Sequence, residues 1–249
     1  MQLWLLLTCG LVGVFAVPYL VGACRIYAAR QRRRAELRQV LKTVREYEFI
    51  PVQVESLAET TRRQFERHTP AMQQLGFLPQ GDFRMKPQPV EVHNRFFLSP
   101  DGDVLGSISA LLDKGGVTFI SVLADGVCIN TTSAKNPRPD RTLEETDQLL
   151  LTYAGNDNAL ELYNLHQANL DAVVQGRGAE ALCFSADQLR DLMVYDQRLF
   201  NRWRYRHGDF ATEPPAADFT TLQQSPVNSA RGEGESGVGG SVESGCCCS

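Results

Sequence analysis

The stretch VLGSISALLDKGGVTFISVLADGVCINTT, residues 104–132, decides the fold class. It contains three apolar runs rich in β-branched residues, separated by the turn sequences Lys114-Gly115-Gly116 and Asp125-Gly126. The runs cover residues 104–112, 117–124 and 127–132. Asp-Gly is the preferred pair for a two-residue type I′ hairpin turn. The stretch therefore predicts three consecutive antiparallel strands joined by short turns.

The preceding residues extend this sheet. Residues 90–98 alternate between apolar and polar side chains, and Ser99-Pro100-Asp101-Gly102-Asp103 is a strong turn signal. Residues 77–86 add an edge strand, which Pro79 and Pro87 limit in length. The pattern predicts a four- to five-stranded antiparallel meander. Such sheets keep one face in solvent, so helices are expected on the other face.

Apolar residues at helical spacing predict the covering elements. The predicted helices cover residues 53–68, 70–76, 156–176 and 186–206, and a short strand is predicted at 148–155. Thr69-Pro70 is expected to begin the second helix, and Ser185 and Gln188 form a capping-box sequence before the last. The fold class is therefore α+β, with one globular domain at about 50–210.

Residues 3–24 contain no charged side chain over 22 positions. A helix of this length is roughly 33 Å long, enough to cross the hydrocarbon core of a bilayer. We therefore predict a single transmembrane helix within residues 1–24, followed by a basic helical stalk at 25–49.

Charge orients this predicted anchor. Residues 25–45 contribute +7 to a net charge of −4, which leaves −11 on residues 46–249. Positive residues mark the cytoplasmic side of a membrane span, so the N-terminus is predicted outside and the body in the cytoplasm. The arginines expected at the membrane surface are Arg25, Arg30, Arg32, Arg33 and Arg34. An acidic body argues against nucleic-acid binding.

Cys24 supports an alternative location. Val21-Gly22-Ala23-Cys24 fits a permissive lipoprotein processing site, after which the chain would be exported. A secretory signal, however, carries its basic residues before the apolar run, whereas here they follow it. The order of charge favours the uncut anchor.

The C-terminal residues 211–249 are rich in Gly, Ser and Glu and are predicted to be disordered. They end in Cys246-Cys247-Cys248, a candidate site for a soft metal or for lipid attachment. Only Cys128 and Cys183 of the seven cysteines fall in the domain, so no disulfide framework is expected.

No common catalytic or nucleotide-binding motif occurs in the sequence, and no cofactor is predicted. Two residues are candidates for catalysis. His166 lies on the apolar side of its predicted helix and would serve as a base if the sheet supplied a partner. Cys128 would serve as a nucleophile only beside a histidine. For both residues a structural role in the core is the simpler interpretation.

These patterns favour a binding or protein-interaction module, held at the cytoplasmic face of the membrane, over an enzyme. The alternatives are a motif-poor enzyme, such as a hydrolase using His166 or Cys128, and a structural or assembly protein at the membrane. The partners expected are the membrane and a protein, and no oligomeric state is indicated.

The predicted topology is testable by thiol labelling. If the body is cytoplasmic, a membrane-impermeant maleimide applied to intact cells leaves Cys246–Cys248 unlabelled, because the bilayer excludes the reagent. The same reagent applied after lysis serves as the control for thiol reactivity. Labelling of these cysteines in intact cells would instead support the exported form.

Overall fold

A computed structural model describes residues 23–29, 31–32, 47–86, 91–111, 114–136, 142–210 and 213–223. Among them, no helix combines the length and apolar character needed to cross a membrane. Apart from Ala23 and Cys24, the predicted span at 3–24 lies outside the described residues, as do Arg30, Arg33, Arg34 and Cys246–Cys248. Residues 23–29 are helical and exposed.

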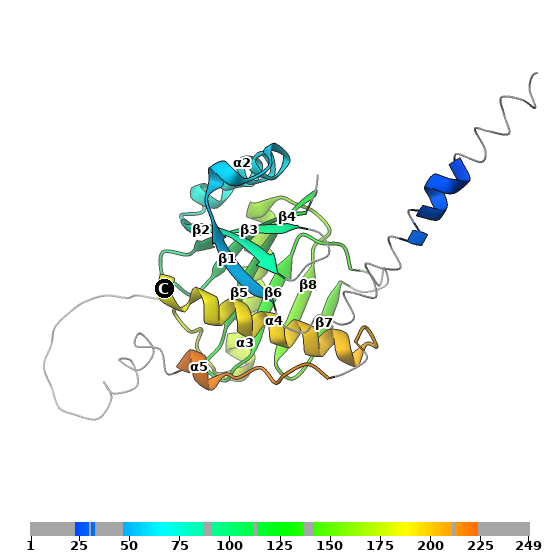
Figure 1. Cartoon of the computed structure of the whole chain (residues 1–249). Helices are drawn as coiled ribbons and strands as arrows, with labels where there is room; N and C mark the ends of the chain where they lie inside the picture. Colours follow the sequence, from blue (N-terminus) through cyan, green and yellow to red (C-terminus); the bar gives the residue numbers. More distant parts are fainter. Residues whose placement is uncertain are drawn as a thin grey trace, which may run out of the picture.

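The domain is built on one sheet of eight strands, in the order β1-β2-β3-β4-β5-β6-β8-β7 (Figure 1). The strands are β1 (Glu48–Val52), β2 (Leu78–Lys86), β3 (Val92–Leu98), β4 (Leu105–Leu111), β5 (Lys114–Val122), β6 (Cys128–Thr132), β7 (Leu143–Glu145) and β8 (Leu149–Tyr153). Neighbours from β1 to β6 are antiparallel, whereas β6 and β8 are parallel. The α+β class and the central meander are confirmed, but the sheet is larger and mixed.

The additional strands lie at the two edges. The helical stalk was predicted to extend to residue 49, yet Glu48–Val52 form β1 beside β2, with Pro51 inside the strand. Proline is tolerated there because an edge strand needs hydrogen bonds on one side only. Consequently β2 is an internal strand, not the predicted edge. At the other edge, β7 pairs with β8, which inserts between β7 and β6.

The main helices are α2 (Glu59–Gln74), α3 (Ala159–Arg177) and α4 (Leu189–Arg206); the short ones are η1 (Val54–Ser56), η2 (Ala186–Gln188) and α5 (Thr220–Gln223). The predicted boundary at Thr69-Pro70 is wrong, since α2 continues through Pro70. Phe65 and Met72 lie two turns apart on either side of that proline, and both are fully buried against the sheet. Their packing outweighs the local cost of proline.

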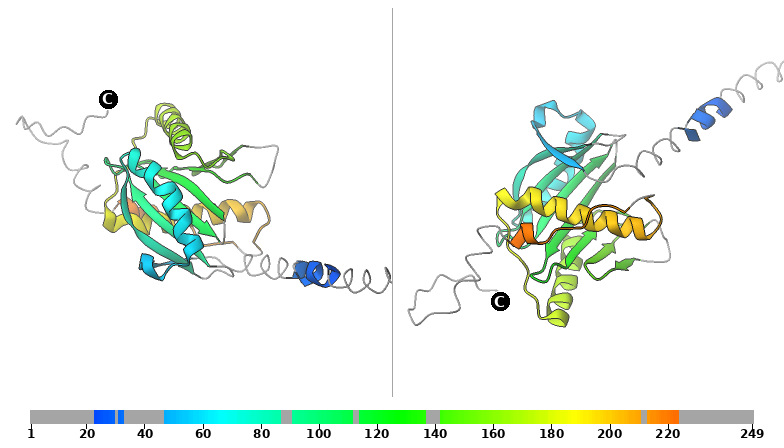
Figure 2. Two further views of the ribbon diagram at one scale, coloured as in Figure 1. Left: turned by 90° about the horizontal axis from the view of Figure 1, so that it is seen from above. Right: turned by 60° about the horizontal axis from the view of Figure 1, so that its bottom comes forward.

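Helices cover both faces of the sheet, so the expectation of one solvated face is also wrong (Figure 2). Phe119 points from β5 into a core with α2 and α3, where it contacts Phe77 and Tyr163. Its neighbour Ile120 points into a second core beneath α4. Successive residues of a strand face opposite sides, so burial of both requires a helix layer on each side.

The folded chain continues past the boundary predicted at 210. Phe219 packs against Tyr195, with the ring centroids 5.7 Å apart, and Leu222 is fully buried in the core beneath α4. The predicted disordered tail therefore begins with a segment that packs on the domain. Residues 224–249 lie outside the described part of the chain.

Candidate functional site

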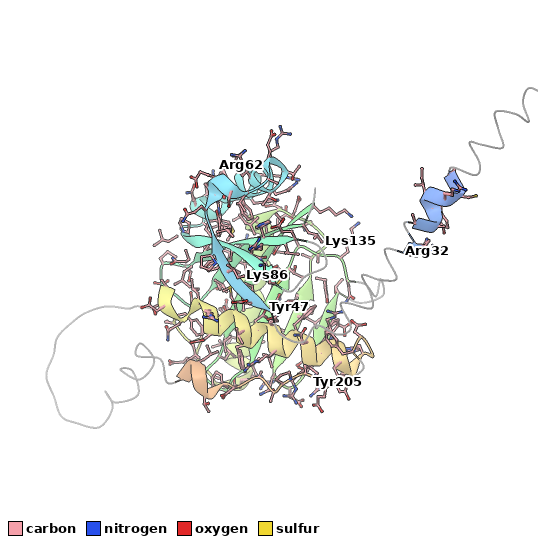
Figure 3. All side chains as sticks on the ribbon, in the orientation of Figure 1. Arg32, Tyr47, Arg62, Lys86, Lys135 and Tyr205 are labelled. Carbon is pink, nitrogen blue, oxygen red and sulfur yellow. The ribbon has the colours of Figure 1, made fainter. Side chains whose placement is uncertain are left out.

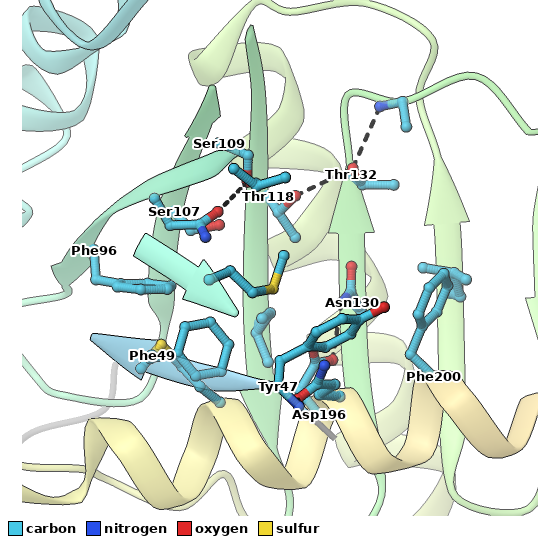
Figure 4. A pocket seen from close by; sticks show the side chains of 18 of the residues that line it. Tyr47, Phe49, Phe96, Ser107, Ser109, Thr118, Asn130, Thr132, Asp196 and Phe200 are labelled. Carbon is cyan, nitrogen blue, oxygen red and sulfur yellow. Dashed lines mark hydrogen bonds between the residues drawn. The ribbon is translucent and has the colours of Figure 1, made fainter. Parts of the chain in front are cut away.

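A cavity of about 600 Å³ separates the middle of the sheet from α4 (Figure 4). We call it the α4 pocket. Its space arises because the central strands carry short side chains there, among them Ser107, Ser109, Thr118 and Thr132. Larger side chains surround this centre and make the wall mainly apolar: Phe49, Met85, Val92, Phe96, Leu111, Ile120, Leu151, Tyr153, Met193 and Phe200. Such a wall suits an apolar guest.

Asp196 is the acidic group of the α4 pocket. It belongs to the inner side of α4, between Met193 and Phe200, and is half-buried at the pocket wall. Its Oδ1 accepts a hydrogen bond from Asn130 Nδ2 at 2.9 Å and lies 3.5 Å from the Sγ of Cys128, which donates to it. Burial raises the pKa of Asp196, and these two hydrogen bonds lower it to a smaller extent. The carboxyl therefore keeps its proton to higher pH than an exposed aspartate.

Three buried side-chain amide atoms on the pocket wall have no hydrogen-bond partner within the described part of the chain: Asn94 Nδ2, Asn130 Oδ1 and Gln197 Nε2. The side chains are 5%, 7% and 9% exposed, respectively. Each amide uses its other end, since Asn94 accepts from Ser109 and Gln197 accepts from the backbone N–H of Tyr47. An unpaired buried polar atom costs about 1–3 kcal/mol. Two unpaired donors and one unpaired acceptor thus belong to residues that line the pocket.

Cys128, one of the predicted catalytic candidates, adjoins this site but is fully buried. Burial raises the pKa of its thiol well above the ordinary value, and the negative charge of Asp196 raises it further. A protonated thiol is a poor nucleophile. In the structure the partner of Cys128 is an aspartate and not the histidine that the nucleophile hypothesis requires.

His166, the other candidate, lies on the opposite face of the sheet, where its ring contacts Phe119. It is completely buried, with Nε2 3.0 Å from Ser121 Oγ and Nδ1 3.1 Å from Thr131 Oγ1. Burial lowers the pKa of His166 to about 3, so the ring is neutral at physiological pH. Both ring nitrogens are already paired with hydroxyl groups. The geometry supports a structural role, and the catalytic role stays a prediction.

Asp196 was not singled out from the sequence. Asp196 lies three residues after Met193 and three before Leu199, both on the apolar stripe of α4. An acid within an apolar stripe is the signal that distinguishes it from its exposed neighbours.

No pattern in the sequence indicated that Tyr47 lines the α4 pocket. Its approach to the α4 pocket depends on β1 pairing at the edge of the sheet, which the helical stalk prediction excluded. The predicted membrane-surface residues Arg25 and Arg32 are exposed and lie outside this site.

In the described part of the chain, no three His, Cys, Asp or Glu side chains converge to hold a metal ion. Comparison of the chain with protein-family models, curated proteins and solved structures finds no match. The site is therefore interpreted from its own geometry.

Replacing Asp196 tests whether its environment opposes ionisation. The unfolded chain ionises this group above about pH 3.8, whereas the folded state retains the proton to higher pH, so the wild type loses stability as pH rises above 3.8. We expect the unfolding free energy of Asp196→Asn relative to wild type to increase from pH 4 to pH 7. Urea unfolding of the full-length chain, followed by tryptophan fluorescence, measures the difference. Asp191→Asn, at an exposed position of the same helix, should show no such trend; a flat difference for Asp196→Asn would contradict the assignment.

The burial of His166 should make the stability of the fold depend on pH with the opposite sign. Its pKa is about 3 in the fold and 6.5 in the unfolded chain, so protonation of the unfolded chain destabilises the protein as pH falls below 6.5. Between pH 8 and pH 5 this contribution amounts to about 2 kcal/mol. His166→Gln should be less stable at neutral pH but lose about that much less on acidification. The exposed His207→Gln is the control, and an unchanged pH slope in His166→Gln would refute the buried neutral state.

Proposed function

We propose that this domain binds one small, largely apolar ligand in the α4 pocket, and that the N-terminal segment holds it at the cytoplasmic face of a membrane. The main support for this proposal is the size and lining of the α4 pocket. Ligand sites typically enclose roughly 300–1,000 Å³ and combine an apolar wall with a few polar groups that orient the ligand. The α4 pocket has about 600 Å³, an apolar wall, Asp196, and three lining residues with an unpaired amide atom.

A protein partner has less support from the described surface. The large apolar side chains exposed on the folded domain are Leu78, Leu111, Leu143, Leu160 and Leu165. They are spread over β2, β4, β7 and α3 and do not belong to one element. Protein-binding faces usually present a contiguous apolar patch. The pocket is therefore a better basis for the binding function than the outer surface.

Asp196 supports a second candidate, an enzyme that moves a proton on the bound ligand. A carboxyl whose pKa is raised by burial, inside a cavity of ligand size, is a suitable general acid or base. This candidate differs from the earlier enzyme hypothesis because it does not use His166 or Cys128. Asp196→Asn separates the two functions, since a binding module keeps its ligand in this variant whereas an enzyme loses turnover.

Filling the pocket tests the binding function. Ser107→Phe places a ring among the pocket-lining side chains of β4 and should exclude the ligand, while Ser107→Ala leaves the space open. Native mass spectrometry of full-length protein purified from its own membranes should find a one-to-one small-molecule adduct in the wild type and in Ser107→Ala. The adduct should be lost from Ser107→Phe.

The control for folding is the unfolding midpoint of Ser107→Phe, which should stay close to that of the wild type. An adduct retained equally by a folded Ser107→Phe variant would place the ligand elsewhere. A wild type that never carries an adduct would count against the proposal.

A further inference from the structure

The α4 pocket adjoins a second cavity of about 680 Å³, which we call the strand-end groove. Ser109, Thr118, Thr132 and Ala134 line both cavities. The groove exists because β5 is longer than its partner: it begins at Lys114, whereas its pairing with β6 covers only Thr118–Val122. The two cavities therefore share part of their lining at the ends of the central strands.

Two glycines keep this groove free of side chains. A Cβ atom on Gly115 would lie 2.6 Å from Oε1 of Gln64, and one on Gly116 would lie 3.2 Å from Oγ of Ser133. Larger residues at these positions would press against groups that line the groove. The Lys114-Gly115-Gly116 sequence thus shapes an opening as well as starting a strand.

Among the described residues that line the groove, positive charge is in excess. Lys114 and Lys135 line it and are exposed, and Figure 3 labels Lys135 at the edge of the domain. The third cation that lines the groove, Arg67, is paired with Asp157 at 2.8 Å, so these two charges offset each other. The lining is left with two positive charges on a body whose net charge is strongly negative. Local cations of this kind attract an anionic group.

Polarity changes in order from the pocket to the groove. Phe96, Ile120 and Met193 provide carbon surface, the hydroxyls of Thr118 and Thr132 follow, and the lysine ammonium groups come last. Figure 4 shows these hydroxyl groups on the side of the pocket away from α4, whereas Asp196 lies beside that helix. An anionic head would be attracted at the groove end, whereas the Asp196 end offers it no unpaired cation.

Arg204 is the cation on the wall of the α4 pocket, and its charge is already neutralised by an ion pair. Arg204 Nε lies 2.9 Å from Asp209, and the guanidinium stacks on the ring of Phe210 at 4.7 Å. The lysines of the groove are therefore the better anion site.

We propose that the ligand is an anionic amphiphile, with its hydrocarbon part in the α4 pocket and its carboxylate or phosphate head beside Lys114 and Lys135. This inference rests on the proposed binding function and specifies its ligand class. Tyr47, where the chain enters the domain, lines the same pocket. The stalk predicted at 25–49 would place this pocket within reach of a bilayer, a source of such molecules.

The test compares ligands that share a chain and differ in the head. Full-length protein in phosphatidylcholine nanodiscs is dialysed against radiolabelled dodecanoate, dodecyl phosphate, 1-dodecanol or dodecyltrimethylammonium, with empty nanodiscs as the blank. Both anions should bind at least roughly fivefold more tightly than dodecanol, and the cation should bind most weakly. The preference should shrink in high salt, because exposed charges are screened.

Substitution of the two groove lysines tests where the anionic head of the ligand binds. Lys114→Gln combined with Lys135→Gln should remove the roughly fivefold preference for the anions without changing dodecanol binding. Lys86→Gln, an exposed lysine at the end of β2 and outside both cavities, should leave all affinities unchanged.

The outcomes separate the two proposals. Equal binding of dodecanol and the anions, insensitive to the lysine substitutions, would overturn this inference and leave the apolar pocket intact. Tightest binding of dodecyltrimethylammonium would also overturn it, since a cationic head would be repelled by Lys114 and Lys135. If no ligand bound above the empty-nanodisc blank, the pocket function itself would fail. Loss of all binding in Ser107→Phe would place these ligands in the α4 pocket.

Discussion

The structure depends on the burial of both faces of the central strands. On β5, the adjacent residues Phe119 and Ile120 point in opposite directions, and each is at least 95% buried. Since apolar surface on both sides of a sheet must be removed from water, the fold needs a helix layer on each side. Helices α2 and α3 supply one layer and α4 supplies the other. The helix layers differ in how completely they fill the space above the sheet.

That difference produces the site. Beneath α2 and α3, large side chains such as Phe65, Phe77 and Phe119 form a dense core. Beneath α4, the centre of the sheet carries serine, threonine and asparagine, and the aromatic side chains stand around it. Short polar residues in the middle of a large sheet contribute little packing energy. Their presence is better explained by a ligand than by stability.

Two ionisable groups, one fully buried and one half-buried, illustrate the contrast between core and site. His166 has hydroxyl partners on both ring nitrogens and is held neutral, so its polarity is satisfied within the core. Asp196 faces a cavity, its pKa is raised by burial, and Asn130 beside it keeps an unpaired oxygen. Incomplete pairing of this kind is typical of sites that complete their hydrogen bonds with a ligand. The proposed ligand places its apolar part beside this end and its charge at the groove.

Alternation and turn residues in the sequence alone determined the α+β class, the strands from β2 to β6, strand β8, and helices α3 and α4. These features depend on neighbours along the chain, and so local spacing predicts them. Tertiary structure decided the rest. Strands β1 and β7 exist only because β2 and β8 offer them hydrogen bonds, and α2 passes Pro70 because Phe65 and Met72 are buried together. The site combines Asp196 with Asn130, which lies 66 residues away in the chain, and no local spacing encodes such a contact.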